Sequence, residues 1–206
     1  MPSISHFKIY KPAEPCSLIG ENLKQTMDKI VLERLSTNGR ELDLKGYCVG
    51  LNGMTVFSQH EKLCNVKRLN LGGNRIGDQG AKLMVESPIF GKLQWLELGG
   101  NDLGPEGIRA IGRSTILKKL KTLNLYRNLI KDEGAKFFAE ENMLSQLEEL
   151  DLAQNEIGDE GLMALAVSKK FPNLVAVYMD NNFASAEAKE EARVSSNFRK
   201  LESLNL

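Results

Sequence analysis

The sequence predicts an α/β repeat protein in which a strand, a turn, a helix and a return segment recur every 27 residues. Three observations predict this fold class: apolar pairs of the form Leu-x-Leu recur in register, and both an asparagine column and a glycine column keep the same step. The first apolar residue of each pair lies at 42, 69, 96, 123, 150, 177 and 204. Self-similarity at a fixed period of roughly 20 to 50 residues is typical of stacked-repeat architectures.

The first 39 residues are expected to hold a lead-in and a capping helix, ahead of a repeat domain over 40–206 with six full repeats and a terminal strand. Residues 1–16 contain three of the six prolines and are interpreted as irregular. A helix is expected from about 20 to 36, where apolar residues share one face. These residues are Leu23, Met27, Ile30, Val31 and Leu35. The helix would cover the exposed edge of the first repeat.

Each Leu-x-Leu pair predicts a short strand with one buried face, because successive strand residues point to opposite sides. An asparagine follows five of the strands at a fixed distance, where the chain must turn inward. Its amide both donates and accepts, so it can satisfy backbone groups at the bend and connect one repeat to the next. The column consists of Asn74, Asn101, Asn128, Asn155 and Asn182.

The helix of each repeat is predicted from its start signals. Asp78, Asp132 and Asp159 are interpreted as N-caps, and Pro105 occupies the same column as a first helical residue. Glutamates follow in the first turn, where the helix dipole favours negative charge. The glycine column, which includes Gly161, lies just inside each helix start. The missing Cβ is expected to let neighbouring repeats approach closely.

The unit Leu69-Asn-Leu-Gly-Gly-Asn-Arg-Ile-Gly-Asp-Gln-Gly80 resembles the leucine-rich repeat of the ribonuclease-inhibitor-like subtype, and the resemblance extends over 40–206. It implies a right-handed solenoid, a horseshoe arc with a parallel β-sheet on the concave face and α-helices on the convex face. The ribonuclease inhibitor itself is longer, cysteine-rich and alternates two repeat lengths, so its activity does not carry over. Similar repeats occur in activators of the Ran GTPase, in nucleotide-sensing immune receptors and in bacterial effectors, and the repeat alone does not choose among them.

Composition excludes some classes of function. The 27 Lys and Arg balance 27 Asp and Glu, whereas a nucleic-acid-binding protein usually has an excess of cationic side chains. No stretch approaches the ~18 apolar residues of a membrane span, and the first ten residues lack the apolar run of a secretory signal. Cys16, Cys48 and Cys64 are odd in number and confined to the first third, a poor disulfide framework. We therefore expect a cytoplasmic protein in a reducing compartment.

Sequence motifs for catalysis, cofactor binding or metal binding are weak. We therefore expect a protein that is not an enzyme and that holds no cofactor and no metal. The segment 72–77 begins like a phosphate loop but lacks the Lys-Ser/Thr that would follow, and 99–104 repeats it one unit later. Cys48, His60 and Cys64 could share a metal ion, but no Cys-x-x-Cys pair is present. Ordinary packing or surface exposure is the expectation for these three residues.

The outward strand positions are expected to carry the function, because the solenoid needs nothing from them structurally. Aromatic residues near the centre of a surface dominate binding energies. The face also holds six acids against three bases, which favours a partner with a basic docking patch. The predicted partner-binding residues are Arg68, Trp95, Glu97, Tyr126, Glu149, Asp151, Tyr178 and Asp180. We further expect Gly72 and Gly99 to leave room for a partner's side chain beside Tyr126.

Alternatives remain open. Trp95 could simply stack under Arg68. The prediction of a non-enzymatic protein-interaction module competes with an enzyme regulator, such as a GTPase activator resembling the Ran-activating family, that uses rim residues such as Arg75, Asp102 or Arg127. It also competes with a self-associating structural piece, because the strand at 202–206 starts a seventh repeat and leaves an open edge. A monomer is the first expectation, with association through this edge as the alternative.

Overall fold

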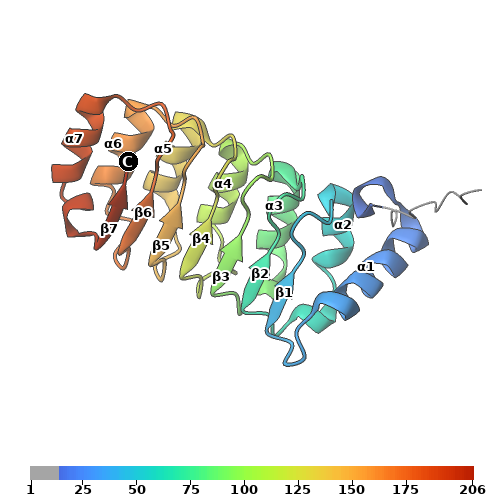
Figure 1. Ribbon diagram of the computed structural model, residues 1–206. Coiled ribbons are helices and arrows are strands. Elements are labelled where there is room, and N and C mark those ends of the chain that lie inside the picture. The colour runs from blue at the N-terminus through green and yellow to red at the C-terminus, as the bar shows by residue number, and fades with distance from the viewer. Residues whose placement is uncertain (1–13) are drawn as a thin grey trace, which may run out of the picture.

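The structure, a computed structural model, describes residues 14–206 and contains one parallel sheet whose strands follow the order of the chain (Figure 1). The strands are β1 (Glu41–Asp43), β2 (Arg68–Asn70), β3 (Trp95–Glu97), β4 (Thr122–Asn124), β5 (Glu149–Asp151), β6 (Ala176–Tyr178) and β7 (Ser203–Asn205). Each strand residue pairs with the residue one repeat later, for example Glu41 with Arg68 and Arg68 with Trp95. The predicted 27-residue step is thus the register of the sheet.

Helices cover one face of this sheet and leave the other open, so the predicted α/β solenoid is confirmed (Figure 1). The helices are α1 (Gly20–Arg34), α2 (Gly50–Phe57), α3 (Gly77–Glu86), α4 (Pro105–Gly112), α5 (Lys131–Glu141), α6 (Asp159–Val167) and α7 (Ala186–Val194). Short 3₁₀ turns are η1 (Pro15–Ser17), η2 (Glu61–Leu63), η3 (Pro88–Phe90) and η4 (Phe198–Lys200). We call the uncovered side the open sheet face; it corresponds to the predicted concave face.

The core lies between the sheet and the helices. The inward residues of the strands are buried, as the Leu-x-Leu pattern predicts; they include Leu42, Leu69, Leu96, Leu123, Leu150 and Val177. The asparagine column connects the repeats as expected. Asn128 Nδ2 donates to the carbonyls of Leu98 and Leu125 at 3.0 and 2.9 Å. Its Oδ1 accepts from the backbone N–H groups of Asn101 and Leu103 at 2.9 and 3.0 Å.

The aspartate column differs from its prediction in which helix it caps. Among α3 to α6 no helix receives a cap from its own N-cap side chain. Asp132, in the first turn of α5, instead accepts from the N–H groups of Gly158 and Gly161 at 2.7 and 2.8 Å, at the start of α6. A Cβ on Gly161 would lie 2.6 Å from Asp132 Oδ1. The glycine column therefore permits the close approach that lets each carboxylate cap the next helix.

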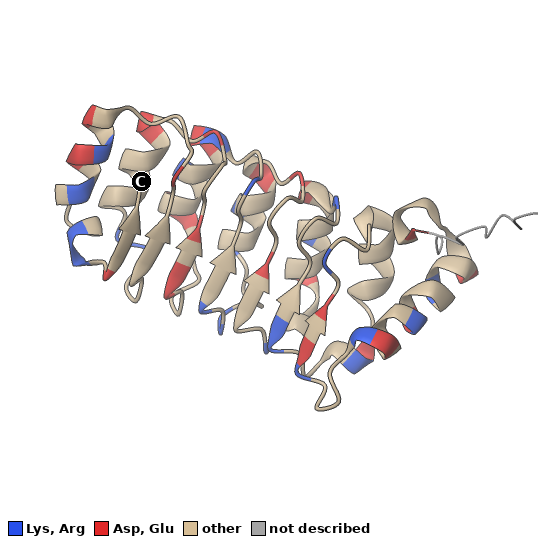
Figure 2. Cartoon of the chain, in the orientation of Figure 1, with Lys and Arg blue, Asp and Glu red and all other residues tan. Residues whose placement is uncertain are grey.

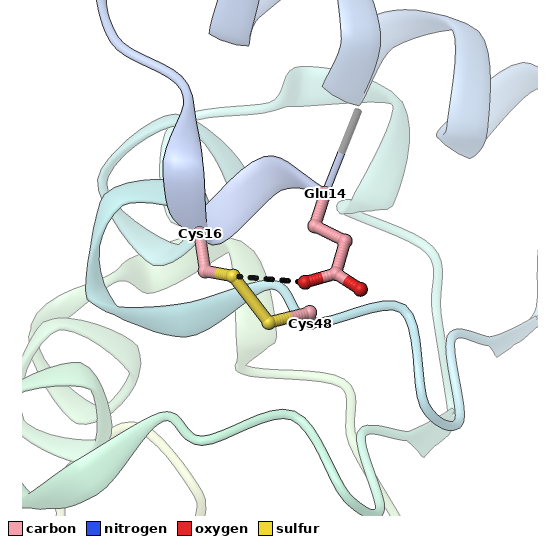
Figure 3. A group of neighbouring side chains, drawn as sticks. All are labelled: Glu14, Cys16 and Cys48. Atoms are coloured by element: carbon pink, nitrogen blue, oxygen red, sulfur yellow. Dashed lines mark hydrogen bonds between the residues drawn. A yellow bond between two sulfur atoms is a disulfide. The ribbon is translucent and has the colours of Figure 1, made fainter. Parts of the chain in front are cut away.

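The N-terminal part contains the predicted helix and an unpredicted disulfide. In α1 the residues Leu23, Met27, Ile30 and Val31 are buried. Cys16 and Cys48 are joined by a disulfide across 32 residues (Figure 3). The expectation of unpaired cysteines was wrong, because η1 lies along the first repeat, where the Cys16 N–H donates to the Cys48 carbonyl at 2.8 Å. Residues 1–13 of the expected lead-in lie outside the described residues.

The disulfide bears on two groups of residues that could hold a metal ion: Cys48 with His60 and Cys64, and Glu14 with Cys16 and Cys48. Cys48 offers no thiolate to His60 and Cys64; the His60 Nε2 lies 3.2 Å from Asp28 Oδ1, and Cys64 is exposed. Glu14 lies beside the bridge, with its Oε2 3.9 Å from Cys16 Sγ (Figure 3). A disulfide sulfur carries no hydrogen, so this approach is a contact only. Metal ligation by cysteine needs a free thiolate, which neither bridged residue provides.

Strand β7 forms one edge of the sheet within the described residues. The predicted seventh strand is present as β7 and pairs there with β6. Its Leu204 is half-buried. Within residues 14–206, no helix has the length and apolar character needed to cross a membrane.

Candidate functional site

The open sheet face presents the predicted columns of outward residues in register. The first column contains Glu41, Arg68, Trp95, Thr122, Glu149, Ala176 and Ser203. The second contains Asp43, Asn70, Glu97, Asn124, Asp151, Tyr178 and Asn205. Neighbours within a column are one strand apart, about 4.8 Å. Tyr126 and Asp180 follow β4 and β6. All of the predicted binding residues therefore belong to this face or to its edge at the carboxyl ends of the strands.

Trp95 and Arg68 form a stacked pair at the N-terminal half of the face. The Arg68 guanidinium carbon lies 4.5 Å from the centre of the Trp95 ring. The ring is half-buried and Arg68 is exposed. Such a contact is worth about 0.5 to 1 kcal/mol at an exposed site. The stacking that the sequence left as an alternative is therefore present, and it fixes the orientation of the indole on the sheet.

Two hollows adjoin this pair. One, of about 310 Å³, reaches from Trp95 to Arg34 and Asp43. The other, of about 400 Å³, reaches from Trp95 to Lys67 and Lys121. Both are lined by Arg68 and Trp95, so the indole stands between two concavities that a partner's side chains can enter.

The charge of the face differs from one end of the strands to the other. The hollow of about 400 Å³ is lined by more bases than acids: Arg40, Lys67, Arg68 and Lys121 against Glu41 and Glu148. Figure 2 shows basic residues at the lower ends of β2 and β4, and acidic ones at the lower end of β5. Arg40, Lys67 and Lys121 precede their strands and are not among the predicted binding residues, whereas Arg68 is. The 27-residue step from Arg40 to Lys67 marks this basic column in the sequence.

The second column has a structural role, although the sequence predicts that the outward strand positions are structurally free. The Oε1 of Glu97 accepts from the Gly99 N–H at 2.6 Å, and the Oδ1 of Asp151 accepts from the Ala153 N–H at 2.9 Å. Equivalent bonds form at Asp43, Asn70 and Asn124. Each oxygen satisfies a backbone donor where the chain leaves the strand. The prediction that these positions are structurally free was wrong.

The space expected beside Tyr126 is also occupied. A Cβ on Gly99 would lie 2.7 Å from Glu97 Oε1 and 3.0 Å from the Tyr126 carbonyl oxygen. The glycine therefore makes room for the Glu97 carboxylate and for the neighbouring strand. A Cβ on Gly72 would lie 3.3 Å from Asn70 Oδ1 and 3.5 Å from Glu97 Cγ, so this position is less crowded. The expected space is therefore filled at Gly99, while Gly72 borders the Glu97 side chain at ordinary contact distance.

Burial and a neighbouring negative charge raise the pKa of two acids at the carboxyl ends of the strands, Glu97 and Asp151. Burial raises the pKa of Glu97, the Gly99 N–H opposes this, and the charge of Asp151 raises it further. Burial likewise raises the pKa of Asp151, the Ala153 N–H opposes it, and the charge of Asp180 adds to the rise. These carboxylates form an electrostatically unfavourable group that a cationic side chain of a partner would relieve.

The aromatic and acidic residues divide into two groups. Tyr178 is half-buried and pairs in register with Asp151, next to Asp180. Tyr126 is 40% exposed and stands at the edge of the face. Glu149 is exposed at the opposite end of β5, where its carboxylate lies 3.5 Å from the Thr122 hydroxyl. The structure thus brings Arg68 to Trp95, and Asp151 to Tyr178 and Asp180, while Glu149 stands apart.

Comparison with known proteins supports the fold. A family model described as Leucine Rich repeat matches residues 62–85, 92–112, 117–139 and 145–166. An internalin (InlF) from Listeria monocytogenes is similar in structure, with a TM-score of 0.53 and 20% identity over 81% of this chain and 47% of that chain. The C-terminal domain of tropomodulin from Caenorhabditis elegans gives a TM-score of 0.49 and 12% identity, over 82% of this chain and 88% of that one.

The chain spans about half the length of the internalin it resembles, and no curated protein matches its sequence. At this level of identity the likeness concerns the fold alone. The repeats matched in sequence and the solenoid seen in the structure agree with one another. Solenoids of stacked repeats offer extended surfaces for binding proteins, and no catalytic family is indicated.

Proposed function

We propose that this leucine-rich repeat protein is a non-enzymatic interaction module of the ribonuclease-inhibitor-like subtype that binds a protein partner on its open sheet face. The subtype is inferred from the outer elements, since α3 to α6 are true α-helices of 10, 8, 11 and 9 residues. The binding proposal rests above all on the stacked Arg68–Trp95 pair between two hollows.

The geometry of the pair favours binding for two reasons. Tryptophan and arginine are the residue types most enriched among energetically dominant contacts in interfaces. Stacking on Arg68 holds the indole in one orientation before a partner arrives, so less side-chain entropy is lost on association. The hollows on both sides give a partner's side chains places to pack beside the ring.

The chemistry of the partner follows from the two charged ends of the face. A basic patch would face Glu97, Asp151 and Asp180, where carboxylates repel one another. An acidic group would face the lower ends of the strands near Arg40 and Lys67. Such opposed charges fix the orientation in which a protein docks and speed its association. A protein with both signs of charge is a better match than a nucleic acid, whose phosphates are all negative.

The decisive experiment compares Trp95→Ala with Ser203→Ala in quantitative capture from a native lysate, followed by affinity measurement on the captured protein. Ser203 belongs to the same column, on β7, lines neither hollow and serves as the matched control. Loss of a central tryptophan typically costs ~2 kcal/mol or more, so we expect at least about a 30-fold loss of affinity for Trp95→Ala. Ser203→Ala should bind as the wild type. Equal binding by all three folded proteins would remove the proposal.

Two alternatives have their own tests. Regulation of an enzyme would be supported by a rise in GTP hydrolysis when the protein is added to a GTPase. Self-association through β7 would be supported by dimers in sedimentation at high concentration. We propose a monomer, because the interaction surface lies around β1 to β4, away from the edge strand β7, and is complete within one chain.

A further inference from the structure

A hollow interrupts the rim where the chain leaves the carboxyl ends of the strands. It measures about 450 Å³ and is lined by Gly73, Arg75, Gly100, Asp102, Arg127, Asn128 and Leu129. We call it the rim notch. Its residues belong to the loops between strands and helices, so it is separate from the hollows around Trp95 on the open sheet face.

Two glycines create the space. A Cβ on Gly73 or Gly100 would meet no atom closer than 3.8 Å, in contrast to the filled position at Gly99. Side chains occupy the equivalent place in the next three repeats, namely Arg127, Gln154 and Asn181. The notch is therefore open over two repeats and is bordered at the third by Arg127.

The backbone of the notch makes the same left-handed turn as the other repeats. Arg127 has a φ of 54°, and Gly46, Gly73 and Gly100 occupy the same column with φ values of 72°, 67° and 63°. Gln154 and Asn181 continue the column outside the notch with φ values of 55° and 56°. The turn therefore belongs to the repeat. Glycine adopts it without strain and arginine does not, so the Arg127 side chain can be removed without loss of the turn.

The charged groups of the notch lack partners within the described chain. Arg75, Asp102 and Arg127 are exposed, and between residues 14 and 206 their side chains make no hydrogen bond or ion pair. By contrast, the Arg109 guanidinium on α4 forms two hydrogen bonds with the Glu141 carboxylate, at 2.8 and 2.9 Å. Free guanidinium groups offer planar, charge-assisted donors that suit carboxylates.

We propose that the rim notch binds an acidic side chain on an extended segment of a protein partner. The guanidinium groups of Arg75 and Arg127 hold the carboxylate, and Leu129, which is 45% exposed, contacts an adjacent apolar residue of the segment. Asp102 lies between the two arginine repeats and limits the net charge of the notch to one positive unit. A single carboxylate matches that charge better than a run of phosphates does. This inference goes beyond the proposed function, because Trp95 has no part in it.

The ligand probe is a capped hexapeptide with one glutamate between leucines, titrated into the ¹⁵N-labelled full chain and followed by NMR. We expect shifts in the amides of Gly73, Gly100 and Arg127, with a dissociation constant on the order of 1 mM. The glutamine version of the peptide should bind at least about tenfold more weakly, because it lacks the charge. Equal binding of both peptides, shifts confined to other repeats, or no shift at about 10 mM peptide would overturn the proposal. Stronger binding of a short single-stranded DNA at the same amides would overturn it too.

Three variants separate the notch from general effects. Arg127→Gly restores the residue type of the three preceding repeats, so we expect an unchanged or higher melting temperature together with at least about a fivefold loss of glutamate-peptide affinity. Gln154→Gly relieves a φ of 55° one repeat further on, outside the notch, and should leave the affinity unchanged. Gly100→Asn places in the notch the residue that the fold accepts at Asn181, and should block the peptide. Equal effects of Arg127→Gly and Gln154→Gly would contradict the proposal.

Trp95→Ala distinguishes this inference from the proposed function. It should leave peptide binding at the notch unchanged even where binding of a partner to the open sheet face is lost. The two proposals can therefore fail separately.

Discussion

Glu97 shows how one side chain on the open sheet face serves both the fold and the site. Its carboxylate accepts the Gly99 N–H, and it lies in the field of Asp151. The sequence predicts its place on the face because the alternation of the strand is clear. It does not predict the bond to Gly99, because that bond depends on how the chain turns after the strand ends. The role of the asparagine column follows more directly from the sequence than the Glu97 bond does. An amide that recurs at a buried bend has few roles other than pairing with backbone groups.

The raised pKa of Glu97 leads to a prediction of pH-dependent stability. Because burial favours the protonated form in the folded state, the wild type is penalised as pH rises through this pKa, and the penalty is absent below the unfolded value of about 4.3. Glu97→Gln keeps an oxygen for the Gly99 N–H and removes the charge. We therefore expect it to raise the unfolding free energy in urea at pH 7 and to leave it nearly unchanged at pH 3.5.

The control for this prediction is Glu149→Gln, an exposed acid of the other column that makes no backbone hydrogen bond through its side chain. It should change the unfolding free energy little at pH 7. A loss of stability for Glu97→Gln at pH 7 would show that its negative charge supports the fold.

At the scale of elements, local sequence patterns predict whether a segment forms a helix or a strand. They do not predict which elements contact one another. The helix expected at 20–36 is α1 at Gly20–Arg34, which ends early because Leu35 forms a bridge with Leu42 of β1. The aspartate column has a clear capping composition, yet the carboxylate of Asp132 caps α6 rather than α5. A one-dimensional period cannot distinguish a helix from its neighbour one repeat later. The disulfide of η1 was missed because residues 1–16 fall outside the period.

The Cys16–Cys48 disulfide leads to a prediction about the N-terminal cap. It closes a loop across 32 residues, for which chain entropy implies a stabilisation of ~3–4 kcal/mol. Reduction should therefore loosen η1 and α1 first, which amide hydrogen exchange of α1 with and without a reductant would measure. The double variant Cys16→Ser/Cys48→Ser should already show the faster exchange and should not respond to the reductant. Unchanged exchange in the reduced wild type would contradict a stabilising role.

The Cys16–Cys48 disulfide also allows an experiment to test whether the protein resides in an oxidising or a reducing compartment. With the bridge formed, only Cys64 can react with a thiol reagent; without it, all three cysteines can. Disulfides persist in oxidising compartments, whereas the sequence argued for a reducing one from the assumption that the cysteines are unpaired. Thiol titration of the protein isolated from its own cells, with alkylation at lysis, decides between the two compartments.

For the whole molecule, the 27-residue period predicts the step between paired strands, and the resemblance to the leucine-rich repeat implies that the strands are parallel. It did not specify the distribution of charge across the open sheet face, because that depends on which residues flank each strand in space. The hollow between Trp95 and Arg34 lies at β1 to β3, and the rim notch lies on the loops that follow β2, β3 and β4. Each repeat packs on its sequence neighbours, so stability is expected to vary along the solenoid.

This expected variation in stability along the solenoid leads to a prediction for two leucines that occupy the same position in different repeats. Leu123 is fully buried in β4, with a repeat on each side, whereas Leu204 is half-buried in β7 at the open edge. Leu123→Ala should reduce the unfolding free energy by about 2–5 kcal/mol and shift the whole urea transition. Leu204→Ala should speed hydrogen exchange only in β6, α7 and β7 and leave the midpoint nearly unchanged, because the end of a solenoid opens without the rest. If Leu204→Ala shifts the whole transition as far as Leu123→Ala does, the repeats unfold as one unit. The rigidity of the surface around Trp95 would then depend on the terminal repeat as well.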